Sequence, residues 1–274
     1  MHWCKREVRN MLESSERIEA KMASTNISAE HITKVYQARK KQTVAMQDCS
    51  IQILENEFVC IVGASGCGKS TLLRMLAGLD FPTEGTITVN DKPVTGPGVD
   101  RGMVFQGYTL FPWLTVEQNL RYGLKLKKMP KPQQDEIVDK YLKIIGLSNF
   151  RNAYPHQLSG GMKQRVAIAR MLANSPEFLL MDEPFGALDP ITKARLQVFL
   201  REIWRELRPT TVFVTHDIEE AVFLATKIYV LSSRPGRVKA EIPVNLTYKR
   251  TLDLKDTEEF YAYYQQIEKL IQEN

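Results

Sequence analysis

The amino-acid sequence predicts an α/β fold built around a largely parallel β-sheet. Short apolar or β-branched runs alternate with helical patterns along the chain, which is typical of a parallel sheet covered by helices. One of the apolar runs leads into a glycine-rich loop that opens a helical pattern. The 274 residues, of which 43% are hydrophobic and 25% charged, supply enough apolar material for a core.

The first 26 residues mix charged positions with scattered apolar ones and have no long apolar face. We therefore expect residues 1–26 to form a mobile N-terminal extension. Met22 opens a segment that could itself begin a protein, so residues 1–21 are either an extension or a misassigned start.

The regular elements follow from residue 27 onward. Apolar and polar residues first alternate as in strands, and after Gly68 the apolar spacing changes to that of a helix, which Gly78 ends. Residues 115–150 have a helical pattern that contains a basic, proline-punctuated connector. The expected strands are Ile27–Val35, Val44–Leu54, Glu57–Val62, Thr86–Val89, Gly102–Phe105, Phe178–Met181 and Thr211–Val214, with a loop over Asp91–Asp100 and a helix over Met162–Ala173.

Composition and charge exclude several classes of protein. No apolar run approaches the roughly 18 residues of a membrane-spanning helix, and the N-terminus lacks the apolar core of a signal peptide. We therefore expect a soluble, intracellular chain. The four cysteines and four histidines are scattered, so we expect neither disulfides nor a zinc site. The net charge of +5 permits anionic partners without choosing among nucleotides, nucleic acid and acidic membrane.

Residues 63–70 form a phosphate-binding loop of the pattern G-x-x-x-x-G-K-[ST], placed between a strand and a helix. Glycines let the backbone N–H groups point at phosphate oxygens, and the following helix presents its positive end. Lys69 would neutralise phosphate charge, and the Ser70 hydroxyl would ligate Mg²⁺. The residues of this loop and its first helical turn are Gly63, Ala64, Ser65, Gly66, Cys67, Gly68, Lys69, Ser70 and Thr71.

Two carboxylates, Asp182 and Glu183, end the apolar run Phe178–Met181. An aspartate at the end of a strand can hold Mg²⁺, and the next carboxylate can orient or deprotonate an attacking water. With a phosphate loop upstream, this pair predicts nucleoside triphosphate hydrolysis.

Leu158-Ser159-Gly160-Gly161-Met162 resembles the signature motif of ATP-binding-cassette (ABC) ATPases. Ser159 has the position of a helix N-cap, so the start of the following helix would form a second anion-binding end. Further positions resemble motifs of the same family: Gln106 the Q-loop glutamine, Ala187-Leu188-Asp189 the D-loop, His216 the switch histidine, and Tyr36 the aromatic residue on which adenine stacks.

The resemblance covers residues 27–240 and implies a P-loop NTPase core of the ABC type, with an antiparallel β region and an inserted α-helical subdomain. It implies a head-to-tail pair of subunits, in which each ATP lies between one subunit's P-loop and the other's signature motif. Catalytic roles then fall to Glu183 as general base, to His216 and to Gln106. Ser70, Gln106 and Asp182 would hold Mg²⁺, and Ser159, Gly160, Gly161 and Asp189 would complete the ATP site across the interface.

The same resemblance implies a transporter subunit. About 50 residues separate Gln106 from Leu158, which suits a small helical subdomain and excludes the long insertions of DNA-repair relatives. The apolar stretch 107–116 is expected near the groove that receives a permease. The sequences of residues 100–102, 110–116 and 231–236 are similar to those of nitrate, sulfonate and taurine importers, whereas Gly107 and Tyr108 depart from that pattern. Similar sequences occur in importers of other small solutes, so the expected solute is small, and an anion such as nitrate, a sulfonate, taurine or bicarbonate is one candidate. The alternative is a soluble ABC ATPase that acts on nucleic acid or as a regulator.

We expect three regions: the extension 1–26, an ABC ATPase domain over 27–246 with its helical subdomain at about 107–175, and a helical tail over 247–274. The expected partners are a second ATPase subunit, identical in the simplest case, and transmembrane permease subunits. A periplasmic or surface solute-binding protein would act indirectly, and no nucleic acid is expected. The chain would then work at the cytoplasmic face of the membrane, held there by the permease.

Overall fold

The computed structural model describes residues 26–38, 41–107 and 109–273. The expected extension 1–26 therefore lies, apart from Asn26, outside the described residues, and so does Cys4. The strands are β1 (Ile27–Ala38), β2 (Lys41–Ile53), β3 (Phe58–Val62), β4 (Glu84–Val89), β5 (Lys92–Pro93), β6 (Arg101–Val104), β7 (Phe178–Asp182), β8 (Thr210–Val214), β9 (Lys227–Leu231) and β10 (Val238–Pro243). The α-helices are α2 (Lys69–Leu76), α3 (Val116–Leu126), α4 (Lys131–Ile144), α5 (Gly160–Leu172), α6 (Pro190–Leu207), α7 (Ile218–Leu224) and α8 (Glu258–Gln272), with short 3-10 turns at Ser148–Phe150, Pro155–Gln157 and Leu252–Asp256.

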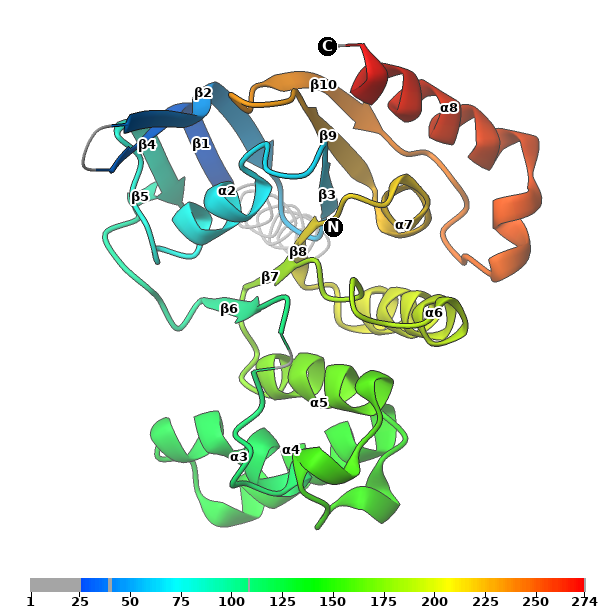
Figure 1. Cartoon of the computed structure of the whole chain (residues 1–274). Helices are drawn as coiled ribbons and strands as arrows, with labels where there is room; N and C mark the ends of the chain where they lie inside the picture. The colour runs from blue at the N-terminus through cyan, green and yellow to red at the C-terminus, as the bar shows by residue number, and fades with distance from the viewer. Residues whose placement is uncertain (1–25, 39–40, 108, 274) are drawn as a thin grey trace, which may run out of the picture.

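Two sheets make up much of the upper part of the molecule in Figure 1. One is antiparallel, with the order β2-β1-β4-β5. The other has the order β10-β9-β3-β8-β7-β6 and is parallel except for the edge strand β10. The α/β fold with a largely parallel sheet and an antiparallel region is therefore confirmed.

The central strands β3, β7 and β8 are buried along their whole length. Such continuous apolar runs are required where a parallel sheet is covered on both faces. Residues of β3 alternate between two buried clusters: Phe58, Cys60 and Val62 pack on one side, and Val59 and Ile61 on the other. Because β3, β7 and β8 run parallel to one another, their carboxyl ends lie at the same edge of the sheet.

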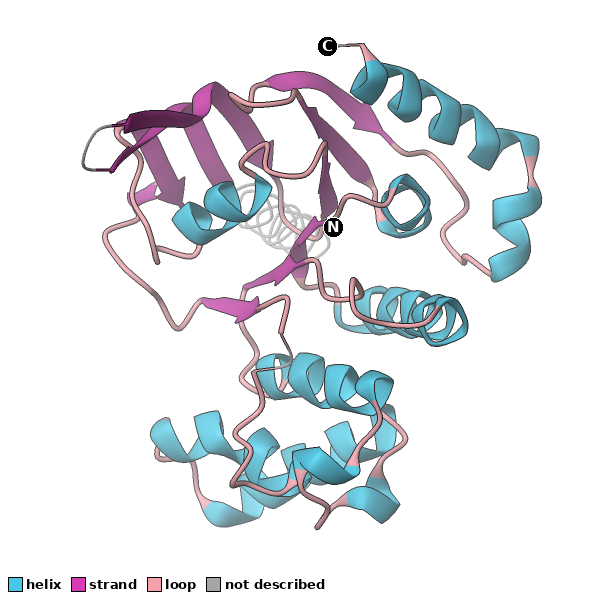
Figure 2. Cartoon of the chain, in the orientation of Figure 1, coloured by secondary structure: helices cyan, strands magenta, loops and turns pink. Residues whose placement is uncertain are grey.

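Helices α3, α4 and α5 form a separate group, joined to the sheets through the segments around β6 and β7 (Figure 2). Thr115 begins α3 with a capping box, in which its hydroxyl accepts from the Gln118 N–H and the Gln118 side chain accepts from the Thr115 N–H. The buried Asn119 side chain bonds to both the N–H and the carbonyl of Phe111, which fixes the apolar loop before α3. Among the described residues no helix is long and apolar enough to span a membrane.

The chain after β10 returns to the sheet as a 3-10 turn and the helix α8, which lies along α7 and β9. Phe260 and Ile267 of α8 are buried in the main core. The buried Arg250 guanidinium donates to the carbonyls of Val222 and Phe223 at the end of α7. The C-terminal helix therefore packs on its own chain.

Candidate functional site

The phosphate loop lies between the end of β3 and the start of α2. Gly66 and Gly68 have φ angles of 76° and 103°, in the region that favours glycine. A Cβ at Gly68 would also come within 2.8 Å of Met46 Cγ and 2.9 Å of the Ala45 carbonyl oxygen. These two glycines therefore allow the tight, closely packed turn that the sequence pattern predicts.

Lys69 lies inside this loop. Its ammonium group donates to the carbonyl oxygens of Gly63, at 2.9 Å, and Ala64, at 3.0 Å. The residue is only 4% exposed. The loop thus holds a positive charge beside its backbone N–H groups, where an anionic phosphate would bind.

Ser70 and Asp182 are joined directly, since the Ser70 hydroxyl donates to the Asp182 carboxylate at 2.7 Å. Burial raises the pKa of Asp182, and the neighbouring Glu183 adds to this, while the Ser70 hydrogen bond, Arg74 and Lys69 oppose it. A hydroxyl and a carboxylate are hard oxygen donors of the kind that Mg²⁺ takes beside phosphates. The pair therefore fits a magnesium ion that also binds the nucleotide.

Glu183 and His216 follow the neighbouring parallel strands β7 and β8, whose ends are paired at Asp182 and Val214. The Nδ1 atom of His216 lies 3.0 Å from Oε2 of Glu183. Glu183 has a φ of 42°, a left-handed conformation that is unfavourable for a residue with a side chain. Its N–H donates to the Val214 carbonyl, which holds it in that conformation. Strain of this kind is concentrated at functional sites.

A cavity of about 340 Å³ opens over the phosphate loop. Most of the P-loop residues line it, together with two of the predicted catalytic side chains. The lining residues are Tyr36, Thr43, Ala45, Ser65, Gly66, Gly68, Lys69, Ser70, Thr71, Gln106, Glu183 and Arg234. Thr43, Ala45 and Arg234 were not predicted as site residues.

Tyr36, near the end of β1, lines the cavity and is 41% exposed. Its hydroxyl donates to Asp80 at 2.9 Å, and the Lys34 ammonium lies 5.0 Å from the ring centre. The ring is therefore fixed at its hydroxyl end while part of its surface remains open, as a base-stacking residue requires.

The loop between β9 and β10 supports the P-loop from the side. The Arg234 guanidinium donates twice to the Gly66 carbonyl, from Nε at 3.2 Å and from Nη2 at 3.1 Å. Gly236 packs so closely that a Cβ there would lie 2.1 Å from the Cys67 carbonyl oxygen. The sequence analysis noted Arg234 and Gly236 only because residues 231–236 are similar to those of nitrate, sulfonate and taurine importers.

The signature residues are not part of this cavity. Ser159 caps α5, as predicted, by accepting from the Met162 N–H at 3.3 Å, and Gly160 and Gly161 form the first helical positions. Asp189 likewise caps α6 by accepting from the Thr192 N–H, and this hydrogen bond lowers the pKa of its carboxyl. Neither helix start lines the cavity over the P-loop of the same chain.

Comparisons with known proteins agree with these observations. The family model for ABC transporters matches residues 46–186. A nitrate import ATP-binding protein, NrtD of Synechocystis, is 52% identical over 246 residues, which cover 88% of this chain and 92% of the relative. An aliphatic sulfonates import ATP-binding protein, SsuB of Bacillus licheniformis, is 48% identical over 77% of this chain and 81% of the relative.

A solved structure extends the agreement to the fold. It is a dimeric, post-hydrolysis state of an ATP-binding cassette bound to ADP and phosphate, with 35% sequence identity and a TM-score of 0.70. The match covers 81% of this chain and all of the other. Family model, relatives and fold lead to one conclusion: the chain belongs to the ABC transporter family.

Proposed function

We propose that this chain is the ATP-hydrolysing subunit of an importer for a small anion such as nitrate or a sulfonate. The observation that carries the proposal is the convergence of Lys69, Ser70 and Glu183 on one cavity. Asp182 accepts a hydrogen bond from Ser70 and His216 contacts Glu183, so both contact residues that line the cavity. The nitrate and sulfonate import ATP-binding proteins, each about half identical to this chain, support the choice of solute.

The nucleotide is held by groups of distinct kinds. Backbone N–H groups of residues 63–71 and the Lys69 ammonium bind the phosphates, and the open part of the Tyr36 ring stacks on the base. Ser70, Asp182 and the Gln106 amide oxygen would hold Mg²⁺. When bound, the metal ion neutralises phosphate charge. Arg234 holds the Gly66 carbonyl in place by donating two hydrogen bonds to it.

Hydrolysis needs a base beside the terminal phosphate. Glu183 lines the cavity and accepts the proton of the attacking water. His216 lies 3.0 Å away and would keep the carboxylate in place. The resemblance to ABC ATPases implies that it would also contact the terminal phosphate. The remaining charge stabilisation comes from Lys69 and the loop N–H groups.

A second copy of the chain would complete the site. The capped start of α5 presents free N–H groups at Gly160 and Gly161, and in a head-to-tail dimer Ser159 and these glycines would bind the terminal phosphate of the partner's ATP. Asp189 at the start of α6 would lie at the same interface. The similar cassette that is dimeric and bound to ADP and phosphate supports a dimer.

The permease would dock on the helical group. Trp113 is 69% exposed, and Phe111 packs on Tyr122 with a ring distance of 4.4 Å, so the loop before α3 offers an aromatic surface. Docking there would hold the chain at the cytoplasmic face of the membrane. The solute-binding protein would act on the other side and only through the permease.

The decisive experiment changes Glu183→Gln in the full chain. We expect the rate of ATP hydrolysis to fall about 10²- to 10⁴-fold, which is the rate enhancement that a general base typically contributes. The affinity for ATP should remain unchanged, and an ATP-bound dimer should accumulate. Glu177→Gln, at the opposite end of β7 and paired with Asn90, is the matched control and should hydrolyse ATP normally. Normal turnover by Glu183→Gln would refute the assignment of the base.

The transport role has its own test. Reconstitution with the permease in lipid should raise the ATPase rate, and a further rise on adding loaded binding protein would identify the solute among nitrate, sulfonates, taurine and bicarbonate. Stimulation by DNA or RNA instead of the permease would refute the importer assignment and favour a nucleic-acid-linked ATPase.

A further inference from the structure

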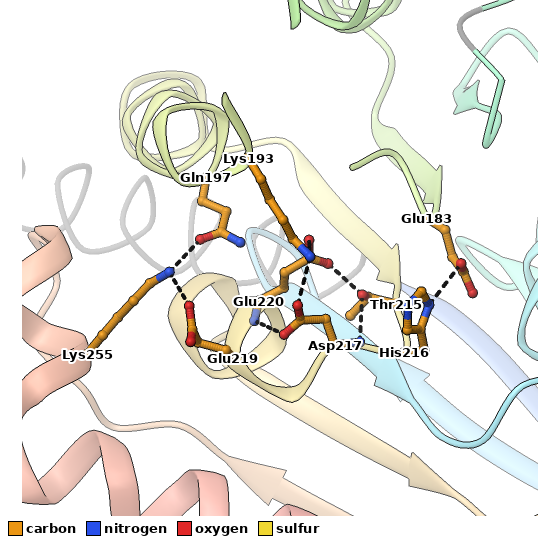
Figure 3. Close-up of polar contacts among 9 residues, drawn as sticks. All are labelled: Glu183, Lys193, Gln197, Thr215, His216, Asp217, Glu219, Glu220 and Lys255. Carbon is orange, nitrogen blue, oxygen red and sulfur yellow. Dashed lines mark hydrogen bonds and ion pairs between the residues drawn. The ribbon is translucent and has the colours of Figure 1, made fainter. Parts of the chain in front are cut away.

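A cluster of charged and polar side chains lies beside His216, on the side away from Glu183 (Figure 3). The Lys193 ammonium, on α6, is 2.7 Å from Asp217 Oδ2 and 2.8 Å from Glu220 Oε1. Only 23% of the Lys193 side chain and 3% of the Glu220 side chain are exposed. We call Lys193, Thr215, Asp217 and Glu220 the Lys193 cluster. In this cluster the Lys193 ammonium forms ion pairs with both carboxylates at the start of α7, Asp217 and Glu220.

The Lys193 cluster fixes the backbone on both sides of His216. Thr215 donates from its hydroxyl to Glu220 Oε2 at 2.5 Å, and the same hydroxyl accepts from the Asp217 N–H at 3.0 Å. Asp217 also caps α7 by accepting from the Glu220 N–H at 3.1 Å. The residues before and after His216 are both members of the cluster, so the cluster holds the backbone from which the imidazole extends.

Lys193 connects this loop to the segment that carries Glu183. It lies in the first turn of α6, where its N–H donates to the carbonyl of the cap residue Asp189. Seven residues of loop lead back from Pro190 to Asp182, and the Gly186 N–H donates to the Glu183 carbonyl within it. Lys193 therefore ties the loop that carries His216 to the start of α6, which follows the loop that begins at Glu183. The side chains of Glu183 and His216 meet at 3.0 Å.

Lys193 is the only cation in the Lys193 cluster and faces two carboxylates, Asp217 and Glu220. Burial by itself would lower the pKa of Lys193, but the hydrogen bonds to Asp217 and Glu220 outweigh it and raise the pKa. Burial raises the pKa of Glu220, although Lys193 and Thr215 oppose this. Without the ammonium, Asp217 and Glu220 would repel each other in a buried place, and the loop between Thr215 and Asp217 would have to rearrange.

We propose that Lys193 is a positioning residue for ATP hydrolysis, which holds the loop 215–217 so that His216 faces Glu183. The inference rests on the proposed ATPase function. Lys193 lines no part of the nucleotide cavity, so it acts on the rate of hydrolysis and leaves ATP binding unchanged.

Kinetics of the full-length chain test this directly. Lys193→Met should lower kcat about 10- to 100-fold, the effect of moving a catalytic group by up to 1 Å, with KM for ATP within threefold of wild type. Lys193→Arg keeps the charge and should restore most of kcat. An unchanged kcat in Lys193→Met, or a rise in KM that matches the fall in kcat, would overturn the proposal.

Lys255→Met is the matched control. The Lys255 ammonium also joins α7 to α6, since it lies 2.5 Å from Glu219 Oε1 and 2.8 Å from Gln197 Oε1 (Figure 3). None of these contacts involves Thr215 or Asp217. Loss of this link should therefore leave kcat near the wild-type value. Equal falls in kcat for Lys193→Met and Lys255→Met would assign both lysines a purely structural role and overturn the proposal.

A second readout does not depend on activity. The chain has four histidines, so the ring signals of His216 can be assigned in ¹H–¹⁵N spectra by comparison with His216→Gln. Lys193→Met should shift the His216 ring signals, and Lys255→Met should not. Unmoved signals in Lys193→Met would overturn the positioning role even if the wild-type chain hydrolyses ATP. If the wild-type chain hydrolyses none, the proposed function fails instead, and the spectra still decide whether Lys193 orients His216.

Discussion

A methyl group added at Gly236 should disturb the P-loop, because Gly236 packs against the backbone of Cys67. The ideal Cβ of Gly236→Ala would lie 2.1 Å from the Cys67 carbonyl oxygen. A carbon atom and a carbonyl oxygen ordinarily approach no closer than about 3.3 Å. One side of this contact must therefore retreat by roughly 1.2 Å. The backbone fixes the position of the Cβ, and the oxygen belongs to the backbone, so no side-chain rotation can relieve the clash.

The magnitude follows from what holds each side. Gly236 donates its N–H to the Ala45 carbonyl and accepts at its own carbonyl from the Gln47 N–H, each at 3.0 Å. Loss of one hydrogen bond costs about 0.5–1.5 kcal/mol, and overpacking about 1–3 kcal/mol. The free energy of unfolding should therefore fall by about 1.5–4.5 kcal/mol. If Cys67 moves instead, a shift of the P-loop by about 1 Å should lower ATP turnover about 100-fold.

Urea unfolding and calorimetric ATP binding at low temperature, where the variant is folded, measure the two effects separately. Gly96→Ala is the control, because a Cβ there would meet nothing within 4 Å. Its unfolding free energy should stay within about 0.5 kcal/mol of wild type. If Gly236→Ala matches wild type in stability, ATP affinity and turnover, the loop at residues 232–236 does not support the P-loop.

Three further predictions concern other parts of the chain. Lys69→Ala should weaken ATP binding at least 10-fold, because hydrogen bonds to charged groups contribute about 1.5–3 kcal/mol; unchanged affinity in calorimetry would contradict the P-loop assignment. The hydrogen bond from Lys193 outweighs burial and lowers the pKa of Asp217, so the ionised carboxylate stabilises the fold above about pH 4, and this contribution is lost as the pH falls through the lowered pKa. The stability gap between wild type and Asp217→Asn should therefore narrow in urea titrations from about pH 6 to pH 3, and a constant gap would argue against the ion pair. Trp113→Ala should reduce permease-stimulated ATPase activity more than the basal rate, whereas equal stimulation would place the docking surface elsewhere.

The fold was predictable where local patterns are strong. Buried strands such as β3, β7 and β8 are continuous apolar runs, and the glycines around α2 mark its ends. Other elements were not singled out, including the apolar strand β9 and the 18-residue helix α6. The two-residue strand β5 lies inside the expected loop over 91–100, and the seven-residue helix α7 spans barely two turns. Strand order was also beyond reach, because β3 pairs with β8 and β9, which come far later in the chain.

The candidate site was likewise predictable only where a local sequence pattern marks its residues. The P-loop and the Asp182–Glu183 pair were predicted because each is a contiguous pattern with a chemical reason for its spacing. Arg234 was missed as a site residue because its contact with Gly66 spans 168 residues and leaves no local signal. Lys193 was missed because a lysine on a helix ordinarily faces solvent, and only the folded structure places two carboxylates against it.

The strand order also has a consequence for synthesis on the ribosome. Strand β3, which leads into the P-loop, is flanked by β8 and β9, and its residue Val62 pairs with Val230. At 5–20 residues per second, roughly 8–34 s pass between the emergence of the P-loop and that of its supporting strand. During that interval the nascent chain exposes an apolar strand without its neighbours, which makes it a natural client of chaperones until the last quarter of the chain arrives.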